Sequence, residues 1–172
     1  MSKDVNFWTG KTDLNLSTGY GAHNIADVNQ TITGKYVGKY EGVNIYESAK
    51  LGQGQYSGGI TLPGRGIIVG NGVMTRNLYP ELLQHEFGHI LQANEVGLKA
   101  FYMVIGKESL ASAAMHGKFG WDHNTFWTET WSNYMSSNYF GSRYIFSSSF
   151  PIQNISWYNY LKLKACTYMP WP

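Results

Sequence analysis

The sequence has a single cysteine, Cys166, few charged residues and no long apolar run. One cysteine excludes an intramolecular disulfide and a cysteine-rich zinc site, so Cys166 is interpreted as a small buried hydrophobe. The longest apolar stretch near the middle of the chain, residues 100–105, is far shorter than the roughly 20 residues of a membrane span. We therefore expect no stable insertion into a membrane.

Charge is also scarce, at 14% of the chain, and thirteen Lys and Arg residues stand against eleven Asp and Glu residues. No basic run is present that could follow a phosphate backbone, so nucleic acid is not expected as a partner. The polar N-terminus has no apolar h-region, which argues against a secretory signal. We expect a protein that is secreted, or delivered into a target cell, without a cleavable signal peptide.

The composition that is present is typical of a globular protein, with 172 residues, 43% apolar residues and 16% aromatic residues. This length suits one domain over residues 1–172. Residues 1–35 are polar and predict loop with one short strand. Val43 and Ile45 alternate with polar neighbours, which is the period of a strand, and residues 60–63 and 67–70 bracket a Gly-rich turn as in a hairpin.

The second half of the sequence is helical in pattern, so the fold class is predicted to be α+β. Pro80 suits the first turn of a helix and Gly97 its end. A second apolar stretch covers residues 98–115, with Gly106 as an expected interruption, before a loop over 117–124. A third helix is predicted over 125–137, with three large apolar side chains at a spacing of four on one face. These three side chains are Trp127, Trp131 and Met135. No element is predicted over 141–172.

The motif HExxH occurs within the first helical pattern, as His85, Glu86 and His89. Side chains four residues apart lie on the same face of a helix, so both imidazoles can bind one metal ion. Glu86 follows the first ligand and can reach a metal-bound water instead of the metal. The motif therefore predicts a catalytic zinc ion (Zn²⁺) whose bound water is activated by the Glu86 carboxylate.

A catalytic zinc ion usually takes three protein ligands, so a third ligand is expected. Glu95 lies where metzincins place their third histidine, but that turn needs a glycine where this chain has Gln92. His116 and His123 are further candidates, both in predicted loop. Glu129 is preferred because it lies on a helical pattern of its own.

Asn133 follows Glu129 by one helical turn and shares its face. It could therefore accept a hydrogen bond from a ligand imidazole, as residues that fix the tautomer of a metal-bound histidine do. The neighbouring tryptophans lie on another face that can pack into the core.

The arrangement of His85, Glu86, His89 and Glu129 resembles that of the gluzincins, the class of the thermolysin-like peptidases. The resemblance implies a zincin-like fold, in which a small N-terminal β-sheet is followed by the HExxH helix and a second ligand-bearing helix. It also implies a zinc metallopeptidase. In that class an acidic residue four positions after the glutamate supports a ligand histidine, and here Asn133 stands in that place without a charge.

A closer resemblance covers residues 84–92, 104–110 and 126–133. These segments are similar to zincin domains at the C-termini of bacterial Rhs-type polymorphic toxins. The resemblance implies an effector or toxin domain that an immunity protein neutralises. A housekeeping secreted peptidase is the alternative enzyme.

The group that stabilises the developing oxyanion is not fixed by the resemblance. His123 is the first choice because it lies in the loop before the Glu129 helix, and His116 and the tyrosines are the alternatives. Zincins commonly bind a peptide or protein substrate along a sheet edge, which residues 60–62 or 67–69 could supply. A non-enzymatic binding domain is the alternative of another class. In that case His116 or His123 would close a structural zinc site.

Overall fold

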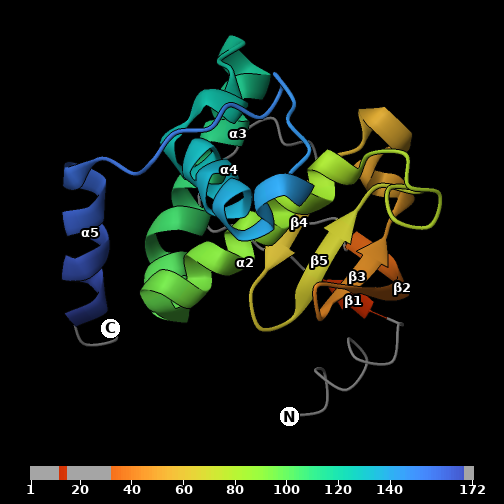
Figure 1. The fold of residues 1–172 in the computed structure, drawn as a ribbon, viewed down its shortest axis with the longest axis horizontal. Coiled ribbons are helices and arrows are strands. Elements are labelled where there is room, and N and C mark those ends of the chain that lie inside the picture. The colour runs from red at the N-terminus through yellow and green to blue at the C-terminus, as the bar shows by residue number, and fades with distance from the viewer. Residues whose placement is uncertain (1–11, 15–31, 169–172) are drawn as a thin grey trace. The chain divides into compact units, whose positions relative to one another are not determined.

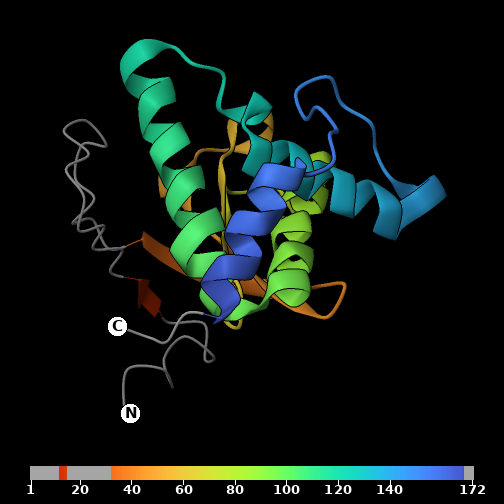
Figure 2. The same cartoon turned by 90° about the vertical axis from the view of Figure 1, so that its left-hand side faces the viewer.

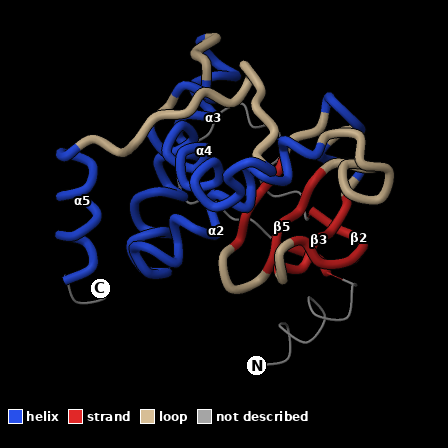
Figure 3. The backbone as a smooth tube through the Cα atoms, in the orientation of Figure 1, coloured by secondary structure: helices blue, strands red, loops and turns tan. Residues whose placement is uncertain are grey.

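The computed structural model describes residues 12–14 and 32–168. The chain forms two compact units, which divide between Glu86 and Phe87, inside the long helix that carries the HExxH motif. Of the described elements, all the strands lie in the N-terminal unit and most of the helices lie in the C-terminal unit (Figure 3). The class is therefore α+β, as predicted.

The N-terminal unit is built on a five-stranded sheet with the order β1-β2-β3-β5-β4 (Figure 1). All neighbouring strands are antiparallel except β3 and β5, which are parallel. Two short 3₁₀ turns, η1 (Ala49–Leu51) and η2 (Gly54–Tyr56), join β3 to β4. The strands are β1 (Thr12–Leu14), β2 (Ile32–Tyr40), β3 (Val43–Glu47), β4 (Gly59–Leu62) and β5 (Gly66–Val69).

The predicted strand at Val43 and Ile45 and the predicted hairpin are both confirmed, as β3 and as the pair β4–β5. Strand β4 lies at the edge of the sheet, whereas β5 lies between β3 and β4. The expectation that residues 67–69 supply an edge is therefore wrong, and β4 is the candidate among the described strands. All four residues of β5 are buried, which is typical of a strand covered on both faces.

Helix α2 (Pro80–Ala100) begins at Pro80 as predicted. Proline suits the first helical turn because its missing N–H has no partner there. Gly97 has a φ of 84° and a ψ of 155°, so it breaks the helical backbone where the sequence predicted an end. Glycine tolerates this left-handed region at little cost because it has no Cβ.

The C-terminal unit continues from α2 through a π-helical turn, η3 (Phe101–Gly106), into α3 (Lys107–Phe119). Gly106 is the last residue of η3, but its φ of −60° and ψ of −42° are helical, so the predicted interruption is a change of helix type and not a break in the helical backbone. The turn η4 (His123–Thr125) precedes α4 (Trp127–Phe140), and η5 (Gly141–Arg143) follows it. Helix α4 is the predicted third helix, and it begins two residues later and ends three residues later than predicted.

The last helix, α5 (Trp157–Tyr168), was not predicted, and it packs against η3 (Figure 2). Glu108 on α3 links α4 and α5, because it accepts hydrogen bonds from Trp127 Nε1 at 2.8 Å and from Lys162 Nζ at 2.7 Å. Cys166 is half-buried and packs against the core of the unit. That core consists of Ala93, Val96, Ala100, Phe101, Val104, Ile105, Trp131 and Leu163.

Within residues 12–14 and 32–168, no helix has the length and apolar character needed to cross a membrane.

Candidate metal centre

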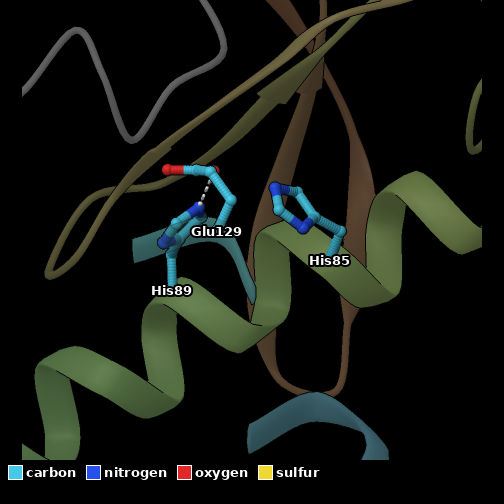
Figure 4. Close-up of side chains that lie close together, drawn as sticks. All are labelled: His85, His89 and Glu129. Carbon is cyan, nitrogen blue, oxygen red and sulfur yellow. Dashed lines mark hydrogen bonds and ion pairs between the residues drawn. The ribbon is translucent and has the colours of Figure 1, made fainter. Parts of the chain in front are cut away.

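Helix α2 presents His85 and His89 from the same side, and Glu129 on α4 lies beside His89 (Figure 4). One ligand atom from each of the three residues lies within 4.8 Å of the others. All three are buried, and Glu129 is only 1% exposed. A buried carboxylate is costly unless it is paired, so this cluster is a set of groups that a metal ion could bind together.

A glycine in the HExxH motif explains why α4 can run so close to α2. A Cβ at Gly88 would overlap the backbone oxygen and the hydroxyl of Ser132 on α4. Glycine inside a helix costs roughly 1 kcal/mol relative to alanine, and the close approach of the two helices accounts for its presence here. Ser132 lies one turn after Glu129, so the same contact brings the carboxylate to the two histidines.

The ring of His89 is held on both sides. Its Nδ1 lies 2.8 Å from Oε1 of Gln92, and its Nε2 lies 3.2 Å from Oε2 of Glu129. The amide nitrogen of Gln92 donates to the carbonyl oxygen of Thr128 at 2.7 Å, which directs the amide oxygen of Gln92 toward the imidazole. Nδ1 of His89 is therefore the protonated nitrogen, and Nε2 is the atom available to a metal.

Glu129 is also fixed at both of its oxygens. Oε1 accepts a hydrogen bond of 2.7 Å from the hydroxyl of Thr128. Oε2 faces His89, and Nε2 of His123 lies 3.7 Å from it. The carboxylate therefore has one oxygen anchored in the protein and one directed at the imidazoles.

Two of the other three candidates for the third ligand, Glu95 and His116, lie away from the cluster. Glu95 and His116 are both exposed, and neither belongs to the cluster. Nδ1 of His116 contacts the carbonyl oxygen of Trp121 instead. His123 is the exception, because its half-buried ring lies next to Glu129 although it is not one of the three clustered residues.

Asn133 is fully buried on α4, and its amide nitrogen donates to the carbonyl oxygen of Pro151 at 2.9 Å. That bond leaves the amide oxygen as the group that can accept a hydrogen bond from elsewhere. The partner of His89 is Gln92, so a contact of Asn133 with His85 stays a prediction.

Glu86 is buried beside the first ligand, and its contacts are with strand β4 of its own unit. The hydroxyl of Thr61 lies 2.6 Å from Oε2 of Glu86 and 2.9 Å from its backbone oxygen. The predicted catalytic carboxylate is thus attached to the edge strand of the sheet.

Sequence reasoning missed three supporting residues: Gln92, Thr128 and Thr61. Gln92 could have been found, because it lies three residues after His89 and so shares its helix face. Thr128 and Thr61 carried no signal of this kind, since their roles depend on contacts between separate elements.

Comparison of the chain with protein-family profiles, with curated proteins and with solved structures gave no match.

Proposed function

We propose that this protein is a zinc-dependent hydrolase, a zincin-like metallopeptidase with His85, His89 and Glu129 as the metal ligands. The observation that supports it most is the convergence of these three buried side chains from two helices. Two imidazoles and one carboxylate are a ligand set that catalytic zinc sites use, with the fourth position left to water or substrate. Gln92 supports the assignment because metal-bound histidines commonly carry such a partner on the other nitrogen.

When bound, a zinc ion polarises a carbonyl group and lowers the pKa of a coordinated water to about 7. Glu86 accepts the proton of the attacking water and passes it to the leaving amine. Its position next to His85 in the motif brings it to the metal centre without making it a ligand. Its burial, at 4% exposed, keeps bulk water from competing for the carboxylate.

His123 is proposed as the residue that stabilises the oxyanion. Its Nε2 lies 3.7 Å from Glu129 Oε2, so the ring is next to a metal ligand and still partly open to solvent. A hydrogen-bond donor in that place can meet the charge that develops on the substrate carbonyl.

The substrate is proposed to be a peptide or protein, and the biological role that of a bacterial effector or toxin domain. The role rests on the similarity of residues 84–92, 104–110 and 126–133 to Rhs-type toxin zincins. It implies delivery into a target cell and neutralisation by an immunity protein. A housekeeping secreted peptidase would use the same site without such a partner.

One observation favours a second candidate, a binding domain with a structural zinc ion. His123 is close enough to Glu129 to become a fourth ligand after a small movement of its ring. All four positions would then be closed, and no water would be activated. In that case His123→Ala would lower zinc affinity as strongly as His89→Ala.

The test begins with zinc content, measured by elemental analysis after dialysis against a limiting zinc buffer. We expect one zinc ion per chain in the wild type, and much less in His89→Ala and Glu129→Ala. Glu95→Ala is the matched control, since this exposed glutamate lies outside the cluster. Equal zinc in the wild type and in Glu129→Ala would contradict the metal site.

The second step measures hydrolysis of fluorescein-labelled casein by the zinc-loaded protein. Glu86→Gln should keep its zinc and lose activity by about 10²- to 10⁴-fold, the usual contribution of a general base. The same variant should lose toxicity when it is produced inside a susceptible cell. A zinc-loaded Glu86→Gln that is fully toxic would favour the binding domain.

A further inference from the structure

Two residues of strand β4, Gly59 and Thr61, lie against the side chain of Glu86. Gly59 and Thr61 are two residues apart, so they lie on the same face of the strand. The carboxylate of Glu86 lies on that face. A Cβ at Gly59 would overlap Oε1 of Glu86, and the hydroxyl of Thr61 is 2.6 Å from Oε2.

The two contacts are complementary. The one proton of the Thr61 hydroxyl has two acceptors, Oε2 of Glu86 at 2.6 Å and the backbone oxygen of Glu86 at 2.9 Å, and the shorter contact is to the carboxylate. Gly59 leaves the space that the other carboxylate oxygen occupies. Hydrogen bonds to an ionised carboxylate are shorter and stronger than those between neutral groups. A carboxylate held at one oxygen and packed at the other can no longer rotate freely, so both of its oxygens have a fixed direction.

We propose that Thr61 is the positioning residue for Glu86 and that Gly59 provides the space this orientation needs. The inference rests on the proposed function, in which Glu86 accepts a proton from the attacking water. Proton transfer requires the carboxylate oxygen within hydrogen-bond distance of the water, so a freely rotating Glu86 would be a poorer base. Thr61 itself does not touch the substrate or the metal ligands in this account. The edge strand therefore contributes to catalysis through the side-chain hydroxyl of Thr61.

The structure offers well-matched variants. Thr61→Val has the same shape without the hydroxyl, and Thr61→Ser keeps the hydroxyl. Gly59→Ala places a methyl group against Oε1 of Glu86, whereas Gly58→Ala, its neighbour, meets open space. Neither glycine has a positive φ, so alanine strains neither backbone. Thr75→Val is a further control, because Thr75 donates to a different carboxylate, that of Glu47.

Each variant is loaded with zinc, and three quantities are measured: zinc content, kcat and KM for fluorescein-labelled casein, and affinity for acetohydroxamic acid. Acetohydroxamic acid binds a metal through two oxygens and gives its hydroxyl proton to a neighbouring carboxylate, so it reports the orientation of Glu86 without turnover. Thr61→Val and Gly59→Ala should lose about 10- to 100-fold in kcat, with KM and zinc content unchanged. Both should also bind acetohydroxamic acid more weakly.

Thr61→Ser should recover most of the kcat, and Gly58→Ala and Thr75→Val should match the wild type. Wild-type kcat and acetohydroxamate affinity in Thr61→Val would overturn the inference. Loss of zinc in Thr61→Val would overturn it too, because Thr61 would then maintain the metal site and not the base. If the wild type cleaves no casein, peptidase activity fails on this substrate, and acetohydroxamate binding alone decides the role of Thr61.

Discussion

Oγ of Ser112 lies 2.5 Å from Nδ1 of His123, and it donates its only proton to the carbonyl oxygen of Ser109 at 2.9 Å. When Ser112 donates to Ser109, its oxygen can only accept from the imidazole, so we expect Nδ1 of His123 to carry a proton. In a neutral ring the lone pair is then on Nε2, the nitrogen beside Glu129. With that tautomer, the donor role proposed for His123 needs a ring protonated at both nitrogens, whereas the alternative role as a metal ligand needs the neutral ring.

From this contact we predict that Ser112→Ala removes the preference of the neutral His123 ring for protonation at Nδ1. The wild type should show the ¹⁵N signals of a ring protonated at Nδ1, and the variant should lose that preference. Ser137→Ala is the control, since Ser137 makes the same bond to a carbonyl oxygen, that of Tyr134, without a histidine partner. Identical His123 signals in the wild type and in Ser112→Ala would contradict the assignment.

We predict that a substitution of Gln92 lowers the zinc affinity although Gln92 is not one of the proposed metal ligands. Gln92→Met has a similar shape but cannot accept the proton of His89 Nδ1, so zinc affinity should fall about 10- to 100-fold. A fluorescent zinc indicator in competition with the protein measures this. The exposed Gln153 gives the control Gln153→Ala, which should bind zinc as the wild type does. Unchanged affinity in Gln92→Met would show that the ring of His89 is held by other contacts.

We predict that substitution by alanine has opposite effects on the free energy of unfolding at two helical glycines, Gly88 and Gly117. Gly88→Ala forces α2 and α4 apart and should lower the free energy of unfolding by about 1–3 kcal/mol, as overpacking of a core does. Gly117→Ala, on α3, meets open space and should raise it by about 0.5–1 kcal/mol. Urea unfolding of the metal-free proteins measures both. A stabilising Gly88→Ala would contradict the close approach of the helices.

Glu47 predicts a pH dependence of stability in the N-terminal unit. Burial acts to raise the pKa of this carboxyl, but hydrogen bonds from Thr75, Gly72 and Met74 outweigh it, so the pKa lies below the ordinary 4.5. The charged form is thus favoured by folding. The stabilisation is complete above pH 4.5 and is lost as the pH falls through the lower pKa of the folded state.

Glu47→Gln tests this by comparison of unfolding free energies at several pH values. The variant should be less stable than the wild type by about 1–3 kcal/mol at pH 7, because charge-assisted hydrogen bonds are lost. The difference should shrink below pH 4.5 as the wild-type carboxyl becomes protonated. A difference that does not change with pH would mean that the charge of Glu47 contributes nothing.

Local patterns were sufficient for much of the fold and for the choice among candidate ligands. Pro80 and Gly97 mark the ends of the HExxH helix because their backbone restrictions act wherever they occur. Glu129 is preferred over Glu95 because it lies on a helical pattern of its own and because Gln92 replaces the glycine that a ligand at Glu95 would need, and Glu129 is the residue found in the cluster. Both inferences needed only periodicity and the chemistry of single residues.

Contacts between segments that are distant in the sequence could not be predicted from local patterns. The central place of β5 follows from its parallel pairing with β3, which no local pattern encodes. Helix α5 lies in a Ser-rich and aromatic tail without a clear period, and Lys162 on it is bound to Glu108 on α3. Thr61 looked like an ordinary strand residue, because its partner Glu86 is 25 positions away.

The contact between Gly88 and Ser132 has a consequence for recognising related chains. A side chain at the first of these positions would overlap the backbone of the second helix. Any chain in which the two helices approach in this way should then read His-Glu-x-Gly-His, followed at a variable distance by a glutamate on the second helix. That pattern is more selective than HExxH alone, because it also requires a glycine at the fourth position of the motif.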